Sequence, residues 1–291
     1  MLEYRGYDST GAVIQDDDKI TLKKDVGAPS RVSYELGIDK LSGSVFCGQV
    51  RWATFGVVNK ENAQPHEVRC KTHIYGAHNG NITNCLQLKE WLSAMGHKVV
   101  SDNDGEMLVH TVEHFFADEL KFKNNLDYDV RYKALVAAIN RAYKKVTGSF
   151  AAIIVDPVTK NVAAIKSGSS LYIGQGQDPI SGHFSIASSD LASVLNLTKI
   201  LIPIKEGQFS IFNGNNFQMF ELSTGKSISH QSQRSLLKIE DTKLQHPFKY
   251  FMEQEIHSQI QNTRNLISLF TGGKKIVKAF LDNEDEYGNI Y

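Results

Sequence analysis

The chain has no excess of charge of either sign, and this bears on its partners. Its 291 residues contain 32 Lys plus Arg and 32 Asp plus Glu, so the formal net charge at pH 7 is zero. A balanced chain has no overall field to attract nucleic acid or an anionic membrane surface. We therefore expect neither as a partner.

Long apolar runs and a cysteine framework are also missing. The longest uninterrupted apolar runs cover residues 134–139 and 150–155, far short of the roughly 18–20 residues that a membrane helix needs. The first residues include Glu3, Arg5 and Asp8, where a signal peptide requires an apolar stretch. Three cysteines cannot all pair, and none forms a C-x-x-C motif, which favours a reducing compartment. We expect a soluble, cytoplasmic protein with no membrane span.

One metal-like pattern is present, at His110-Thr111-Val112-Glu113-His114. It matches the H-x-x-E-H motif of inverted zinc peptidases, and on a helix His110 and His114 would share one face, as two zinc ligands must. Five-residue patterns arise easily by chance, and an amphipathic helix with two polar positions is the favoured interpretation of this one. We therefore expect no metal site and no cofactor.

The order of the predicted elements indicates an α+β fold. Apolar stretches at 12–14 and 20–22 flank a charged loop and predict a hairpin, and 44–53 and 73–77 read as strands. Helical spacing follows at 86–95, 104–120 and 130–146, and short strands then return between residues 150 and 212. Strands, then helices, then strands favour a layered α+β domain over a βαβ repeat.

The composition changes near Ser229. Residues 230–243 are polar and irregular, 248–269 resume a helical pattern, and 281–291 are acidic without apolar spacing. We expect one domain over residues 1–240, followed by a linker and helical segment over residues 241–291.

A set of polar residues between positions 49 and 106 has the chemistry of an amino-acid site. Arg51 stands at the end of a predicted strand and can hold a carboxylate by two parallel hydrogen bonds. Asp104 opens a predicted helix, where it can hold an ammonium group or cap the helix. Asn79 and Gly80, at the end of another predicted strand, offer an amide and a backbone N–H for an oxyanion. Asn-Gly is more often a simple tight turn, so that interpretation stays open.

The ordered motifs of the chain resemble one family. Residues 2–9 (LEYRGYDS), 51–54 (RWAT), 62–66 (NAQPH), 78–80 (HNG) and 101–106 (SDNDGE) occur in one order. Together they are similar to the glutaminase domain of the glutamine–fructose-6-phosphate aminotransferases, class II amidotransferases that begin hexosamine synthesis. The resemblance continues through 167–169, 186–190 and 206–207, and 251–256 resembles the segment that leads into the sugar-isomerase half of those enzymes.

The resemblance implies an N-terminal-nucleophile hydrolase-like fold, a four-layer αββα sandwich. By position, Arg51 and Asp104 would hold the carboxylate and the amino group of L-glutamine. Asn79 and Gly80 would form the oxyanion hole. The resemblance implies no cofactor.

Three further positions have implied roles. Thr54 would line the glutamine pocket, Trp52 would gate the passage of ammonia, and Arg5 would support the pocket near the chain start. Fructose 6-phosphate would be handled by an isomerase domain that is separate from this sequence or missing from it.

The resemblance also implies a nucleophile that these 291 residues do not supply. In the family it is an N-terminal cysteine whose own α-amine serves as the base, whereas residue one here is Met1 and the sequence starts inside the family pattern. The nitrogens of Cys47, Cys70 and Cys85 all lie in peptide bonds. We therefore expect the first strand and helix of the fold to be missing, an unpaired sheet edge that favours homo-oligomers, and no useful glutaminase activity.

Four other positions depart from the family pattern. Val50 and Phe55 stand where a hydroxyl and a histidine are usual, Gln64 replaces another histidine, and Gly105 lacks a hydroxyl. Two hypotheses follow. The sequence is either an aminotransferase-family chain truncated at both ends, or a shortened, non-catalytic paralogue that binds glutamine or a partner chain.

Overall fold

The computed structural model describes residues 2–54, 56–123, 126–180, 182–237 and 244–272. The chain divides into two compact units, Met1–Leu237 and Lys238–Tyr291, and each is described by itself. Phe55, residues 241–243 and the acidic tail at 281–291 lie outside the described residues.

The first unit begins with a three-stranded antiparallel sheet of order β2-β1-β3. The predicted hairpin is confirmed: β1 (Ser9–Asp16) pairs with β2 (Lys19–Val26). The turn between them contains Asp17 at a φ of 47°, a conformation that Asp tolerates better than most residues. On its other side β1 pairs with β3 (Val45–Arg51), which is an edge strand of this sheet. Arg51 is the last residue of that strand.

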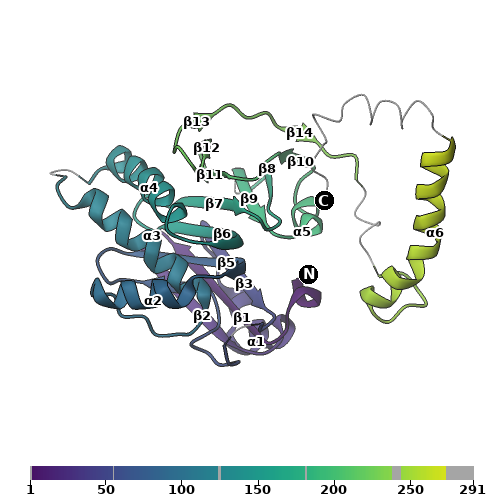
Figure 1. Ribbon diagram of the computed structural model, residues 1–291, viewed down its shortest axis with the longest axis horizontal. Coiled ribbons are helices and arrows are strands. Elements are labelled where there is room, and N and C mark those ends of the chain that lie inside the picture. The colour runs from purple at the N-terminus through teal and green to yellow at the C-terminus, as the bar shows by residue number, and fades with distance from the viewer. Residues whose placement is uncertain (1, 55, 124–125, 181, 238–243, 273–291) are drawn as a thin grey trace. The chain divides into compact units, whose positions relative to one another are not determined.

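A seven-stranded antiparallel sheet forms the centre of the unit (Figure 1), in the order β13-β12-β11-β7-β6-β5-β4. Its strands are β4 (His66–Val68), β5 (Ile74–Ile82), β6 (Gly148–Asp156), β7 (Asn161–Ser167), β11 (Gln208–Phe212), β12 (Phe217–Glu221) and β13 (Ser227–Ile228).

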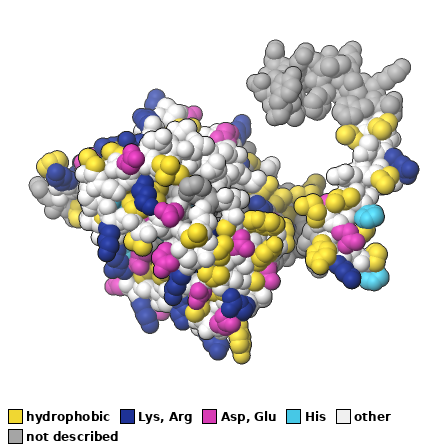
Figure 2. Space-filling view, turned by 60° about the horizontal axis from the view of Figure 1, so that its bottom comes forward, with side chains coloured by type: hydrophobic (Ala, Val, Ile, Leu, Met, Phe, Trp, Pro, Cys, Tyr) yellow, Lys and Arg dark blue, Asp and Glu magenta, His cyan; other side chains and the backbone are white. Residues whose placement is uncertain are grey.

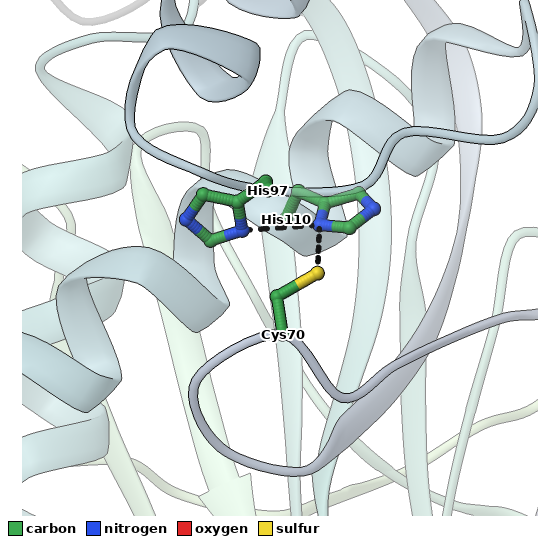
Figure 3. A group of neighbouring side chains, drawn as sticks. All are labelled: Cys70, His97 and His110. Carbon is green, nitrogen blue, oxygen red and sulfur yellow. Dashed lines mark hydrogen bonds between the residues drawn. The ribbon is translucent and has the colours of Figure 1, made fainter.

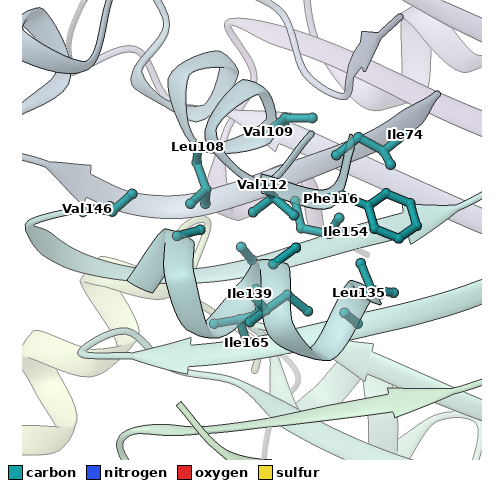
Figure 4. Close-up of a cluster of buried hydrophobic side chains, with 14 of the residues drawn as sticks. Ile74, Leu108, Val109, Val112, Phe116, Leu135, Ile139, Val146, Ile154 and Ile165 are labelled. Atoms are coloured by element: carbon teal, nitrogen blue, oxygen red, sulfur yellow. The ribbon is translucent and has the colours of Figure 1, made fainter. Parts of the chain in front are cut away.

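Three helices cover one face of this sheet: α2 (Cys85–Ala94), α3 (Asp104–Leu120) and α4 (Tyr128–Tyr143). They lie close to the helices predicted from apolar spacing. Figure 4 shows their apolar side chains meeting those of the sheet, including Leu108, Val112, Ile139, Ile154 and Ile165. Burial of these side chains holds α3 and its polar residues against β5.

Two smaller sheets pack on the opposite face. Val13 and Cys47 of the three-stranded sheet contact Tyr75 and Val155. A four-stranded sheet, β14-β10-β8-β9, contributes Ile173 to a separate core cluster. Its strands are β8 (Tyr172–Asp178), β9 (Gly182–Ser188), β10 (Ile200–Ile202) and β14 (Gln233–Arg234).

Short helices lie against these smaller sheets. Helix α1 (Pro29–Leu36) contacts β1 and β2, and α5 (Leu191–Leu195) contacts β8 and β9. The 3-10 helix η1 (Leu2–Arg5) precedes β1 in the sequence, and η2 (Ile38–Lys40) follows α1. The unit therefore has the expected α+β class, with helices outside two layers of sheet, although the second sheet layer consists of two separate sheets.

The second unit contains α6 (Phe251–Gly272), whose exposed apolar residues include Met252, Ile256 and Ile260. Neither α6 nor any other helix in the described part of the chain combines the length and apolarity needed to cross a membrane. On the face of the first unit seen in Figure 2, basic and acidic side chains are interspersed rather than gathered by sign, as the balanced composition leads one to expect.

Candidate functional site

Asp104 is the first residue of α3, and its carboxylate is free of the capping role. The cap is Asn103, whose side chain accepts a hydrogen bond of 2.9 Å from the backbone N–H of Gly105. Asp104 Oδ2 instead lies 3.1 Å from His78 Nε2 and accepts the N–H of Ile82 at 2.9 Å. The start of α3 is thereby joined to β5.

The same contacts keep Asp104 ionised. Burial opposes the charge, but hydrogen bonds from His78 and from the N–H of Ile82 outweigh it and lower the pKa of Asp104. Because the side chain is also at a helix N-terminus, the helix dipole favours its negative form. The position is an anion at neutral pH.

Arg51, at the end of β3, supplies the opposite charge. Its side chain is buried, and Nη1 donates a hydrogen bond of 3.2 Å to the carbonyl of Val57. Asn62 donates to the same carbonyl at 2.8 Å and accepts the N–H of Asp102 at 2.9 Å. Burial lowers the pKa of Arg51, whereas Asp104 and Asp8 raise it; an arginine keeps its charge at any physiological pH. Arg51 and Asp104 are therefore two buried residues of opposite charge, and the charge of Asp104 is one of those that act on Arg51.

Two of the departures from the family pattern are neighbours in space. The side chain of Gln64 holds the backbone of His78 at both ends: Oε1 accepts its N–H at 2.8 Å and Nε2 donates to its carbonyl at 3.2 Å. A Cβ on Gly105 would come within 2.3 Å of His78 Nδ1 and 2.8 Å of Gln64 Oε1. Gln64 and Gly105 therefore fit each other, and together they fix the His78 imidazole that contacts Asp104.

Asn79 and Gly80 were predicted at a strand end, and this is wrong. Strand β5 runs on to Ile82, and these residues pair with Ala151 and Phe150 of β6. Gly80 has a φ of 138°, and a Cβ there would lie 2.1 Å from the carbonyl oxygen of Ser149. Only glycine fits. Both Asn79 and Gly80 are exposed, directly beside the buried His78.

Trp52 and Thr54 follow β3 and are exposed. The Trp52 ring lies 5.5 Å from the ring of Tyr7. The N–H of Ala53 donates to the Asp8 carboxylate at 2.8 Å, which fixes this segment to the chain start.

Arg5 has its described contacts elsewhere. Its Nη1 donates to the carbonyl of Ser189 at 3.1 Å and lies 3.9 Å from Asp190 Oδ1. Tyr4 donates its hydroxyl to the same Asp190 oxygen at 2.6 Å. Arg5 therefore anchors η1 to the segment before α5.

A second polar group was not anticipated. Cys70, His97 and His110 bring one side-chain ligand atom each within 4.8 Å of one another (Figure 3). The H-x-x-E-H pattern indicated His110 but paired it with His114, its neighbour on the helix. Cys70 and His97 lie in loops before β5 and after α2, and no local spacing could have connected them to His110.

Comparisons with known proteins show the family to which the chain is related. The glutamine amidotransferase domain family matches residues 50–195, half of the chain. The glutamine–fructose-6-phosphate aminotransferase (isomerizing) of Buchnera aphidicola is 31% identical over 301 residues, covering 100% of this chain and 44% of that protein. The Pyrobaculum aerophilum enzyme of the same name is 36% identical over 211 residues, covering 72% of this chain and 31% of that protein. The chain spans less than half the length of these curated relatives.

Among solved structures, the glutamine phosphoribosylpyrophosphate amidotransferase of B. subtilis is similar. The TM-score is 0.59 at 23% identity, over 77% of this chain and 45% of that one. At this identity the likeness concerns the fold alone, and it agrees with an N-terminal-nucleophile amidotransferase fold.

Proposed function

We propose that this chain, which belongs to the family of glutamine amidotransferase domains, binds L-glutamine with Arg51 and Asp104. The burial of these two opposite charges, at the end of β3 and at the start of α3, carries the proposal. A free α-amino acid presents a carboxylate and an ammonium group on one carbon. Arg51 can bind the first with two hydrogen bonds, and Asp104, ionised by its contacts with His78 and Ile82, can accept from the second.

Asn79 and Gly80 are proposed as the donors that face the side-chain amide of glutamine. They are the exposed residues next to His78, so a ligand held by Asp104 would have its amide within reach of this part of β5. One oxyanion donor is typically worth about 10²–10³ in rate. Thr54, Trp52 and Arg5 keep their proposed roles at the rim of the pocket, in the gating of ammonia and in support of the chain start.

A polypeptide of these 291 residues is proposed to bind glutamine without useful hydrolysis. A cysteine attacks as the thiolate, yet burial raises the pKa of Cys47 to about 12, and burial is also the largest cause of the raised pKa of Cys85. Cys70 belongs to the separate group with His97 and His110. Loss of a nucleophile costs roughly 10⁶ in turnover in a serine protease.

The acceptor of ammonia is proposed from the names of the relatives only. Those proteins are named for the transfer of nitrogen from glutamine to fructose 6-phosphate. Fructose 6-phosphate is accordingly proposed as the eventual acceptor, bound by a partner chain or by a segment outside the 291 residues. The alternative is a shortened, non-catalytic paralogue that binds glutamine or a partner chain and supplies no ammonia.

Calorimetric titration with L-glutamine tests the binding proposal. We expect saturable binding that D-glutamine does not reproduce, and no ammonia release above the buffer rate. Arg51→Ala should abolish binding. The matched control is Arg69→Ala, because Arg69 pairs on the surface with Glu67 and should leave binding unchanged. Absence of binding to the folded wild-type chain would overturn the proposal, and sustained ammonia release would overturn the non-catalytic part alone.

A further inference from the structure

Three segments that are distant in the sequence bring nitrogen and sulfur atoms to one point. His97 Nδ1 lies 3.3 Å from His110 Nδ1, and His110 Nδ1 lies 3.9 Å from Cys70 Sγ (Figure 3). Both histidines are buried, whereas Cys70 is exposed. The group is therefore rigid on its inner side and open to solvent on its outer side.

The outward hydrogen bonds of the two imidazoles assign their protons. His110 Nε2 lies 3.4 Å from Glu106 Oε1, which can only accept, so Nε2 carries the proton and Nδ1 keeps its lone pair. The same Glu106 carboxylate accepts the N–H groups of Val100 and Ser101 and so is held in place.

The proton on His97 Nε2 is assigned from the contacts of His114. The Lys71 ammonium, which can only donate, lies 3.2 Å from His114 Nδ1. That nitrogen is therefore an acceptor, and His97 Nε2, 3.0 Å away, donates to it. His97 Nδ1 faces His110 Nδ1 at 3.3 Å and the Glu113 carboxylate at 3.1 Å.

A buried carboxylate lies beside His97. Glu113 is fully buried, and its Oε1 accepts the N–H groups of Lys71 and Thr72. Its Oε2 lies 3.1 Å from His97 Nδ1; burial opposes the charge, but this contact helps to lower the pKa of Glu113. A metal ion on His97 Nδ1 would replace the proton shared in this contact and would face a buried negative charge.

We propose that Cys70, His97 and His110 bind a zinc ion. With Zn–N of about 2.0–2.1 Å and Zn–S of about 2.3 Å, a tetrahedral ion places its nitrogen ligands about 3.3 Å apart and nitrogen and sulfur about 3.6 Å apart. The two separations that involve His110 Nδ1, 3.3 and 3.9 Å, are close to these values, and all three ligand atoms lie within 4.8 Å of one another, so Cys70 would have to move toward His97 on binding. The fourth position faces solvent beside Cys70 and takes a water molecule.

The neighbours of the three ligands fit this assignment. A ligating histidine usually donates its other N–H to a carboxylate or another acceptor, which orients the ring. Here Glu106 is the acceptor for His110, and His114 is the acceptor for His97. From the H-x-x-E-H pattern alone we expect no metal. The geometry changes this because the second histidine ligand is His97, and His114 orients it. The ion would join the loop before β5, the α2–α3 connection and α3.

Metal titration of the full chain tests the proposal. We expect about one Zn²⁺ per chain by mass spectrometry, and Co²⁺ should give a thiolate-to-metal charge-transfer band with tetrahedral ligand-field bands. Cys70→Ser should abolish the charge-transfer band and weaken Zn²⁺ binding at least about 100-fold, more than loss of an orienting neighbour does. Cys70 is exposed, so the variant should keep the wild-type circular dichroism. The matched control, Cys85→Ser, should retain the band and the affinity.

A second measurement uses only the wild-type chain. On addition of Zn²⁺, nitrogen NMR should show the Nδ1 resonances of two histidines moving to metal-bound positions. The proposal is overturned if Co²⁺ gives no thiolate band, if Cys85→Ser removes the band, or if His97 is doubly protonated and unmoved by Zn²⁺.

Discussion

The two polar regions on α3 differ in how their charges are balanced. At the first turn, the Asp104 carboxylate receives donors from His78 and Ile82 and lies near the Arg51 guanidinium. Further along the helix, around His110, two imidazole nitrogens and the Cys70 sulfur converge beside the Glu113 carboxylate. The first region carries a fixed cation and a fixed anion, whereas the second gathers side chains that can bind a metal ion once they are deprotonated.

This difference indicates the kind of ligand that each region suits. A site with a fixed cation and a fixed anion matches a zwitterion such as an amino acid. A site that gathers lone pairs matches a metal ion. Glu106, two residues after Asp104, connects the regions because it holds the Val100–Ser101 backbone and orients His110.

The largest expected effect comes from a glycine beside the first region. Gly80→Ala should destabilise the fold by about 4 kcal/mol, because the φ of 138° and the close approach to Ser149 both resist a Cβ. The control lies in the second region: Gly96, next to His97, has a φ of 82° but no atom within 4 Å of an added Cβ. Gly96→Ala should cost only about 1 kcal/mol. Equal urea midpoints for the two variants would show that the close approach of the Ser149 backbone to Gly80 does not add to the cost of a Cβ there.

Removing the anion of the first region should separate the two binding functions. Asp104→Asn is expected to weaken L-glutamine binding roughly 100-fold, about 3 kcal/mol, because the ammonium group loses a charged acceptor. Zinc affinity should not change. Asp118→Asn, near the other end of α3 and paired with Arg141 on the surface, is the control for calorimetry. Unchanged glutamine affinity in the Asp104 variant would contradict the assignment of the amino-group site.

Glu106 tests the connection between the regions. Glu106→Gln should weaken zinc binding about 10-fold, since an amide orients His110 less well than a carboxylate does. Competition against a chromogenic chelator measures the affinity, with Glu119→Gln, on the same helix and paired with Arg141, as the control. An effect of the same size in both variants would argue that helix stability, rather than ring orientation, is responsible.

The smallest expected effect is a loss of folding stability at mildly acidic pH. Burial, together with the nearby Lys24, holds the pKa of His66 well below its usual value of about 6.5. The unfolded chain therefore binds a proton that the folded chain does not. Stability should be complete above pH 6.5 and fall by about 1 kcal/mol between pH 6.5 and 5.5.

His66→Gln should flatten this part of the profile in urea unfolding of the metal-free protein. Asp104, whose pKa is lowered, contributes stability that is lost only at more acidic pH, below the ordinary carboxyl range. A profile that is as steep in the variant as in the wild type would exclude His66 as the group responsible.

Local signals in the sequence predicted many of the helices and strands. The hairpin of β1 and β2 and the start of α3 at Asp104 were readable because turn residues and apolar spacing act over a few positions. Arg51 at a strand end was anticipated in the same way. The prediction of a strand end at Asn79-Gly80 was wrong. Asn-Gly favours a turn locally, but pairing with β6 extends β5 through these two residues.

By itself the sequence determined the α+β class, the helices and the residue types of the proposed amino-acid site, because these depend on periodicity and short motifs. Only the tertiary structure decided that Asn103, not Asp104, caps α3, that Gln64 and Gly105 support His78, and that Cys70 and His97 meet His110. These contacts join segments through the packing of α3 on β5, and no spacing along the chain encodes which side chains that packing brings together.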